Sequence, residues 1–197
     1  NAAGLLECVQ MGTIEFHGWA CHADAVERPD RMVFDLDPDT GIGFPDVRKA
    51  AFELRKQLAE LGLTSFAMLT GGKGIHVSVP LTPGHDWDTH RDFAKRFAEA
   101  MSQAEPDRFV ATMSKARRKE RIFIDWLRNQ RGGTAVVPYS ARARTGAPVA
   151  APVAWDELDA IDRAARWSID DVEELLQRAS GASLKGWGMA TQKLPKI

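Results

Sequence analysis

The stretch MVFDLDPDTG, residues 32–41, places two aspartates one residue apart directly after a short apolar run. Side chains at positions i and i+2 of a β-strand point to the same face, so Asp35 and Asp37 are predicted to face one site. Two unpaired carboxylates at the end of a buried strand repel each other and lose solvation, and a divalent cation is the usual remedy. The pattern therefore predicts a strand over residues 31–36 that ends in a metal-binding pair.

The rest of the chain is predicted to add strands around two long helices. The further predicted strands are residues 11–17, 65–70, 75–80, 108–112, 121–126 and 134–138. Helical spacing of apolar residues predicts one helix from Phe44 that ends before Gly62, and another from about Asp88 to Gln103. Strands gathered around intervening helices indicate an α+β or mixed α/β domain.

Residues 147–155 are rich in Pro and Ala and are expected to form a connection to a helical C-terminal part. Two short helices are predicted there, the second starting at the capping pattern Ser168-x-x-Asp171.

The composition is typical of a globular protein and excludes a membrane-spanning helix. Apolar residues make up 44% of the 197 residues, and no apolar run approaches the ~18–20 residues that span a bilayer. The first residues, NAAGLLECVQMG, lack the features of a secretory signal and start in the middle of a pattern without Met, so we expect a fragment of a longer chain. Cys8 and Cys21 form no metal-ligand spacing, which is typical of thiols in a reducing cytoplasm.

Positive charge is concentrated in one segment, although the net charge of the chain is −1. From Lys115 to Arg144 there are nine Lys and Arg residues against two acidic ones, a net charge of +7. This asymmetry is typical of a surface that faces phosphate groups. A solvated basic face explains it equally well from composition alone.

A glycine-rich loop lies between two of the predicted strands, in TGGKGIHVSVP, residues 70–80. Its glycines allow close approach of the backbone to a ligand and expose N–H groups, and Lys73 supplies a charge suited to phosphate. His76 shares a strand face with Ser78, and either contacts a triphosphate or is an ordinary core or surface histidine. The loop is not a Walker A motif, because the spacing differs and no Ser or Thr follows the lysine.

A third carboxylate, Asp125, ends the apolar run Ile122–Ile124 within RRKERIFIDWLRNQRGG, residues 117–133. A lone acid there is usually a cap or turn residue, but four arginines surround this one: Arg118, Arg121, Arg128 and Arg131. Two aspartates, a distant third and nearby cations are typical of two-metal nucleotidyl transfer. One ion then lowers the pKa of the attacking hydroxyl, and both stabilise the phosphoryl oxygens from about 3.5–4 Å apart.

Two other enzyme classes also use a D-x-D pattern. Haloacid-dehalogenase-like phosphatases place D-x-D-x-T at a strand end, but here Asp39 stands where that pattern needs Thr. Manganese-dependent glycosyltransferases use D-x-D to hold a nucleotide sugar, and that function leaves the basic segment unexplained. Both are weaker interpretations than nucleotidyl transfer.

With these motifs in place, the sequence resembles the polymerase domain of bacterial ligase D, a DNA end-joining enzyme of the archaeo-eukaryotic primase superfamily. The resemblance covers about Leu5 to Trp167, and its blocks are EFHGW (15–19), FDLDPD (34–39), TGGKGIHVSVPL (70–81) and RIFIDWLRNQRGGTAVVPYSARARTGAPVAAPVAWDEL (121–158). It implies a primase-polymerase-like core, an antiparallel sheet packed with helices. Residues 1–197 would be one catalytic domain with a C-terminal helical extension at 147–197. The family carries a further segment before this point that grips the 5′-phosphate of a broken end, so the domain is expected to be N-terminally truncated.

The resemblance also implies roles for individual residues. Asp35, Asp37 and Asp125 match the catalytic carboxylates that bind two metal ions, Mn²⁺ or Mg²⁺. The positions that match the nucleotide-binding pocket are His17, Thr70, Lys73, His76, Arg118, Gln130, Arg142 and Arg144. Thr70 stands where the family usually has Ser and keeps the hydroxyl, and His17 lies in HGW where the family often has HPW.

The implied function is template-directed nucleotidyl transfer during non-homologous end joining, with NTP or dNTP as substrate and ribonucleotides preferred. The implied partners are DNA with a 3′-OH primer end and a template strand, Ku, and ligase and phosphoesterase domains of the parent chain. The implied location is the bacterial cytoplasm, at the nucleoid, without a membrane. Because the N-terminal segment is missing, the alternative is a non-catalytic fragment that binds DNA ends or Ku; primer synthesis de novo is a third interpretation.

Overall fold

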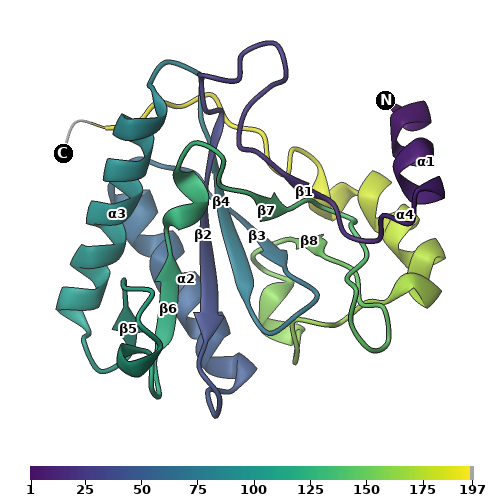
Figure 1. Cartoon of the computed structure of the whole chain (residues 1–197). Helices are drawn as coiled ribbons and strands as arrows, with labels where there is room; N and C mark the ends of the chain where they lie inside the picture. Colours follow the sequence, from purple (N-terminus) through teal and green to yellow (C-terminus); the bar gives the residue numbers. More distant parts are fainter. Residues whose placement is uncertain (196–197) are drawn as a thin grey trace.

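A computed structural model describes residues 1–195, and its centre is a six-stranded sheet (Figure 1). In spatial order the strands are β5 (Phe109–Val110), β6 (Ile122–Asp125), β2 (Arg31–Pro38), β4 (Ile75–Pro80), β3 (Phe66–Leu69) and β8 (Ala151–Val153). All neighbouring strands run antiparallel except β5 and β6, which are parallel. The predicted α+β class with a largely antiparallel sheet is confirmed.

Two long helices, α2 (Phe44–Glu60) and α3 (Trp87–Ala104), pack on one face of this sheet. Alternate residues of the central strands point toward them and are fully buried: Met32, Phe34, Leu36, Ile75, Val77 and Val79. Burial of each such side chain stabilises the fold by about 1.5–3 kcal/mol. The intervening residues of the same strands face the opposite side of the sheet, here called the second face. The aspartates of β2 belong to this second face.

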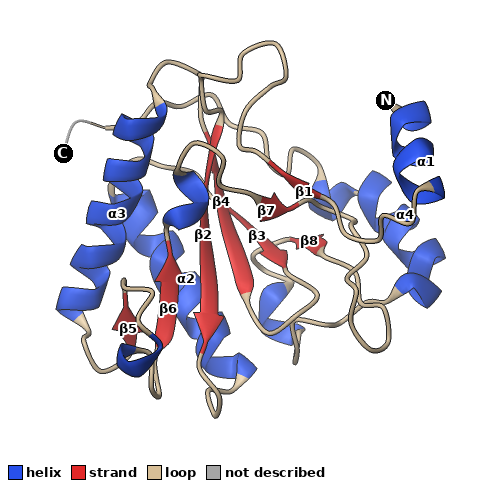
Figure 2. Ribbon diagram, viewed as in Figure 1, coloured by secondary structure: helices blue, strands red, loops and turns tan. Residues whose placement is uncertain are grey.

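A two-stranded sheet, β1 (His17–Gly18) with β7 (Ala135–Val136), lies outside the main sheet, and two shorter helices stand near it in Figure 2: α1 (Ala2–Gln10) and α4 (Val172–Ser180). Single 3-10 turns complete the structure at η1 (Lys115–Arg117), η2 (Leu127–Asn129), η3 (Leu158–Ala160), η4 (Ile169–Asp171) and η5 (Ala182–Leu184). None of the helices in residues 1–195 combines the length and apolar character needed to cross a membrane.

The prediction of a strand over residues 11–17 is wrong for all but its last residue. Residues 2–10 form helix α1, Met11 is its C-cap, and Gly12 takes a positive φ of 84° that an extended strand does not contain. Only His17 and Gly18 pair, with Val136 and Ala135 of β7. The short apolar run had no strand partner close in sequence, so periodicity alone mistook an ordered loop for a strand.

The Pro/Ala-rich connection at 147–155 contains an unpredicted strand, β8. It pairs with β3, and Pro152 lies opposite Met68. Because β8 is the last strand at this edge of the sheet, Pro152 needs no N–H for a further neighbour, and edge strands are where proline is tolerated. The capping pattern Ser168-x-x-Asp171 is present as predicted, and it opens η4 directly before α4.

A buried histidine joins α3 to the start of β2. His90 is 1% exposed and its Nε2 lies 3.0 Å from the carbonyl oxygen of Arg31. Burial lowers the pKa of His90 from 6.5 to about 4, and the hydrogen bond to the carbonyl only partly opposes this effect. The fold therefore requires a neutral imidazole at this position.

We expect the fold to lose stability as the pH falls from about 6.5 toward 4. Between these values the unfolded chain binds the His90 proton and the folded chain does not, so the free energy of unfolding falls by about 2 kcal/mol from pH 7 to pH 5. His90→Gln keeps a donor for the Arg31 carbonyl but does not titrate. In urea unfolding experiments at several pH values, this variant should lose the dependence of the free energy of unfolding on pH between 7 and 5. His22→Gln, at a mostly exposed histidine, should not. Equal acid sensitivity of wild type and His90→Gln would contradict the assignment.

Candidate active site

The register of β2 and β6 places two carboxylates opposite each other on the second face. Asp35 is the cross-strand partner of Asp125 although 90 positions separate them in sequence. Side chains directly opposite in an antiparallel pair have Cβ atoms about 4.5–5.5 Å apart. Asp125 is 8% exposed, so little water is available to screen the repulsion between the two acids.

Arg128 lies between these carboxylates. Its Nη2 is 3.2 Å from Oδ2 of Asp35 and 3.1 Å from Oδ2 of Asp125. The arginine is brought there by the η2 turn that follows β6, and Asn129 fixes this turn to β2. The Asn129 side chain is fully buried, accepts from the N–H of Val33 at 2.7 Å and donates to the Val33 carbonyl at 2.8 Å.

Asp37 faces the same side but is engaged separately. Its Oδ2 lies 3.3 Å from Nη1 of Arg118, whose guanidinium stacks over the ring of Phe123 with its central carbon 3.7 Å from the ring centroid. Within residues 1–195 no group of three His, Cys, Asp or Glu side chains is arranged to hold a metal ion. The structure thus brings Asp35 and Asp125 together with a guanidinium between them, and places Asp37 on the same face, where it pairs with Arg118.

The pKa values of the three acids differ in direction. Burial raises the pKa of Asp35, but attraction to His76 and Arg128 outweighs it and holds the pKa below its usual range. Burial and the charge of Asp35 raise the pKa of Asp37. Burial raises the pKa of Asp125 as well, and Arg128 only partly offsets the rise.

The chemistry of this donor set fits a hard divalent cation. Carboxylate oxygens are the preferred ligands of Mg²⁺ and similar ions. Asp35 and Asp125 share one positive group, the guanidinium of Arg128, and burial is the main cause of the raised pKa values of Asp37 and Asp125. A cation bound here would compete with Arg128 for the same oxygens.

The glycine loop forms the β3–β4 hairpin turn next to these acids. The Thr70 hydroxyl donates to the Gly74 carbonyl at 3.0 Å and accepts from the N–H of Gly72 at 3.2 Å, so the side chain closes the turn. A Cβ at Gly74 would stand 2.4 Å from the carbonyl oxygen of Leu36, which only glycine avoids. This close approach brings Lys73 to the end of β2, near Asp37.

His76 follows the loop and is the cross-strand partner of Asp35 in the β2–β4 pair. Its Nε2 lies 3.5 Å from Oδ2 of Asp35, and the ring is 4% exposed. The histidine therefore contacts the acid directly as well as lining the space above the loop.

A cavity of about 230 Å³, here called the catalytic cavity, opens over this group. Most of the predicted site residues line it: His17, Asp35, Asp37, Thr70, Lys73, His76, Arg142 and Arg144. Asp125 forms an ion pair with Arg128 at the wall of the cavity, and Arg118 forms an ion pair with Asp37. Gln130 is exposed and does not line the cavity, because η2 turns the chain away after Asn129.

Glu15 is a site residue that the motifs did not single out. Its carboxylate lies 3.0 Å from Nε2 of His17, accepts from Nε of Arg142 at 3.0 Å, and accepts from the N–H of Ala143 at 2.8 Å. These hydrogen bonds, the one from His17 most of all, lower its pKa to about 2. Arg142 also donates to the carbonyl of Thr70, so Glu15 ties the β1 segment to the glycine loop. In the sequence it appeared only as the first residue of the EFHGW block, without an assigned role.

Comparison with known proteins identifies the family. The model of the LigD primase-polymerase domain matches residues 1–183. The chain belongs to this family.

Curated members and a solved structure give the extent of the similarity. The multifunctional non-homologous end joining protein LigD of Pseudomonas aeruginosa is 41% identical over 181 residues, 92% of this chain and 22% of that protein. The bifunctional LigD protein of Bacillus subtilis is 31% identical over 183 residues, covering 87% of this chain and 30% of that one. The polymerase domain of Mycobacterium tuberculosis ligase D in complex with DNA superposes with a TM-score of 0.82 at 33% identity, covering 95% of this chain and 68% of that chain. The chain thus spans less than a third of these curated relatives.

Removal of the Arg128 charge should destabilise the metal-free protein. Arg128→Met leaves Asp35 and Asp125 opposed without a cation, and we expect the free energy of unfolding in EDTA to fall by about 1–3 kcal/mol, limited by the partial exposure of the arginine. Mn²⁺ should recover more stability in this variant than in wild type, because no guanidinium competes for the oxygens.

The matched control is Arg131→Met, which breaks an exposed pair with Glu27. Its cost should stay below about 1 kcal/mol. Equal effects of the two substitutions in denaturant titrations would contradict the bridging role of Arg128.

Proposed function

We propose that this domain is a template-directed nucleotidyltransferase that adds nucleotides to the 3′-OH of DNA ends during non-homologous end joining. The observation that carries the proposal is the cross-strand pair Asp35–Asp125 beside a basic cavity in a chain of the LigD polymerase family. The superposed M. tuberculosis polymerase domain is described in complex with DNA, which supports DNA as the partner.

Asp35, Asp37 and Asp125 would hold two divalent cations, with Mn²⁺ favoured over Mg²⁺. Such ions, when bound, lower the pKa of the attacking 3′-hydroxyl and stabilise the negative charge on the reacting phosphate. Arg128 and Arg118 contact only the Oδ2 atoms of the three acids, so an ion would compete with them at those atoms and would find the Oδ1 atoms of Asp35 and Asp37 without a contact to either arginine. Both arginines would then remain near the anionic substrate.

The glycine loop and the basic side chains would hold the triphosphate. Lys73 supplies a point charge, and the backbone N–H groups of the loop are suited to phosphate oxygens. Arg142 and Arg144 line the same cavity, and Glu15 orients Arg142 and His17. The 3′-oxygen attacks the α-phosphate in line, the bond to the bridging oxygen breaks, and pyrophosphate leaves with the electron pair.

The finer points of the proposal are supported by family membership. We propose a preference for ribonucleotides, a template strand that directs the addition, and cooperation with Ku and with ligase and phosphoesterase domains of a longer chain. Residues 1–197 would act as one catalytic domain, in the bacterial cytoplasm at the nucleoid. Arg118 and Gln130 would contact nucleotide or template after a rearrangement, since neither lines the cavity.

The deciding experiment incubates the protein with a gapped duplex, Mn²⁺ and labelled nucleotide. Lengthening of the primer according to the template base supports the proposal. The rival function, a non-catalytic module that binds DNA ends, shifts the duplex in a gel without lengthening the primer. Product on a single-stranded template without primer would identify synthesis de novo.

Asp37→Ala and Asp35→Ala should each abolish primer extension, with a loss of at least about a hundredfold, because each removes a ligand for the ions that stabilise the transition state. Asp37 is the cleaner test, since its side chain is 54% exposed and its loss leaves the core intact. Asp39→Asn is the matched control: it keeps the acceptor for the N–H of Glu120 and does not line the cavity. Wild-type extension by Asp37→Ala would refute the metal assignment.

Lys73→Gln should raise the KM for the nucleoside triphosphate about tenfold or more, because a charge-assisted contact is worth about 1.5–3 kcal/mol. Steady-state kinetics at saturating primer-template measure this effect. Lys49→Gln, at an exposed lysine of α2, is the control and should leave KM unchanged. An unchanged KM in Lys73→Gln would remove the loop from the triphosphate site.

A further inference from the structure

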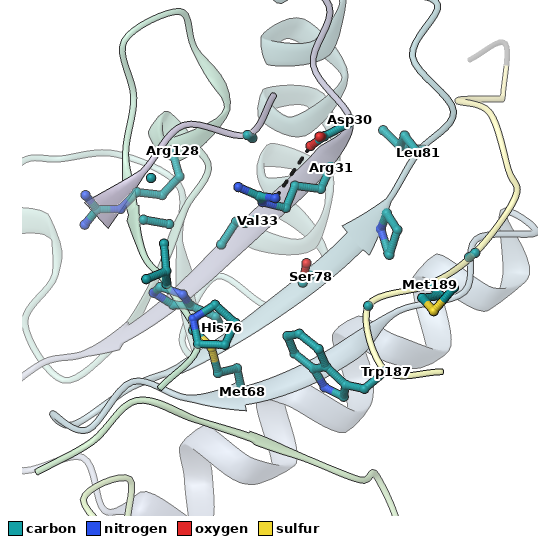
Figure 3. Close-up of a pocket in the computed structure, with 18 of the residues that line it drawn as sticks. Asp30, Arg31, Val33, Met68, His76, Ser78, Leu81, Arg128, Trp187 and Met189 are labelled. Carbon is teal, nitrogen blue, oxygen red and sulfur yellow. Dashed lines mark ion pairs between the residues drawn. The ribbon is translucent and has the colours of Figure 1, made fainter. Parts of the chain in front are cut away.

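A second, larger cavity adjoins the catalytic one on the second face of the sheet (Figure 3). Its volume is about 510 Å³, and the two cavities share His76, Arg128, Ala135 and Val136 in their walls. A ligand in the larger cavity would therefore be continuous with whatever occupies the catalytic cavity. Neither the glycine loop nor the three aspartates line the larger one.

The floor and roof of this cavity are mostly apolar. The floor consists of second-face side chains of the main sheet, among them Val33, Met68 and Ser78, and the roof consists of residues 135–138. Such a lining disfavours a phosphate group, which needs fixed positive charge, and favours the flat surface of an uncharged ring.

The third wall is a C-terminal arm, residues 187–191, that lies beyond the family match at residue 183. The Trp187 ring is held in one orientation: its Nε1 donates to the carbonyl of Ala67 at 2.9 Å, and it meets the edge of Phe66 with ring centroids 6.0 Å apart. Gln192 fixes the far end, because its side chain bonds both backbone groups of Thr64 and the carbonyl of Pro80, each at 2.8 Å. Residues 187–191 are thus anchored at both of their ends.

Charge at the other end of the cavity is balanced. Figure 3 shows the Asp30–Arg31 pair there, away from Trp187 and Met68. Nη1 of Arg31 lies 3.7 Å from Oδ1 of Asp30, and this buried oxygen accepts no hydrogen bond from the described residues. This end is therefore polar without net charge.

We propose that this cavity binds an unpaired nucleobase of the DNA strand held in the adjoining catalytic site. The inference rests on the proposed function, which supplies the strand. Four features fit a base: the volume, the fixed Trp187 ring, the polarizable sulfur of Met68 and the uncharged polar end. Stacking of a base on an aromatic side chain is tolerant of sequence, as a template requires. Arg128, at the junction of the cavities, lies where the strand backbone would pass.

The test places 2-aminopurine, a base whose fluorescence is quenched by stacking, at successive unpaired template positions of a primer-template. Wild type should quench one position near the copied base. Trp187→Leu should lose this quenching and bind the single-stranded template about tenfold more weakly, which is about 1.4 kcal/mol. Ser78→Leu, which fills the cavity while retaining Trp187, should have the same effect.

Trp155→Leu is the matched control. Trp155 also donates to a backbone carbonyl, that of Ser65 at 2.7 Å, and packs against an aromatic ring, that of Phe52, but it does not line the cavity. Its quenching and affinity should equal those of wild type. Thermal melting of all variants shows whether a loss of binding is due to a loss of fold. Trp187→Leu and Ser78→Leu change different parts of the structure, the C-terminal arm and strand β4.

Three outcomes overturn the inference. Unchanged quenching in folded Trp187→Leu and Ser78→Leu shows that no base enters the cavity. Weaker binding of free ATP with unchanged template binding assigns the cavity to the nucleotide substrate. Equal losses in Trp155→Leu show a general effect of removing tryptophan. In each case wild-type primer extension still supports the proposed function, whereas absent extension with intact quenching would overturn that function alone.

Discussion

The structure depends on the backbone pairing of β2 with β6, which holds Asp35 and Asp125 opposite each other. Ladder hydrogen bonds and the packing of the alternate residues Phe34, Leu36 and Ile124 against the helices fix this register. A slip of one residue would turn those apolar side chains to the second face, so the register cannot relax to separate the acids. The burial of apolar side chains on the helix-covered face thus keeps the two negatively charged side chains, Asp35 and Asp125, close together on the second face.

Arg128 offsets this enforced repulsion, and its position depends on Asn129. Asn129 satisfies both backbone groups of Val33 that an additional strand residue would otherwise have paired, so the η2 turn behaves as an extension of the sheet. The Arg128 guanidinium therefore offsets part of the negative charge of the Asp35–Asp125 pair.

The sequence indicated the second-face acids because strand alternation is a local rule that links Asp35 with Asp37, and Asp125 carried the same signal at the end of its own apolar run. It could not indicate that Asp35 faces Asp125 and His76 directly, because strand order and register depend on contacts far apart in the chain. Glu15 and Asn129 stand inside the quoted motif blocks, but their roles depend on such long-range contacts, so the motifs did not indicate what they do. Strand β8 escaped prediction because Pro152 suppresses the local signal and is acceptable only at a sheet edge.

The glycines of the β3–β4 loop differ in how far the backbone allows them to be substituted. Gly74 meets the Leu36 carbonyl and Gly71 has a positive φ of 67°, so both positions are closed to other residues for backbone reasons, independently of any ligand. At Gly72 an added Cβ would make only ordinary contacts, at 3.4 Å, with Arg144 and Thr70. Of the three glycines in this turn, Gly72 is therefore the one that drift and directed evolution can change without loss of the hairpin, and substrate selectivity could diverge among descendants through variation at this position.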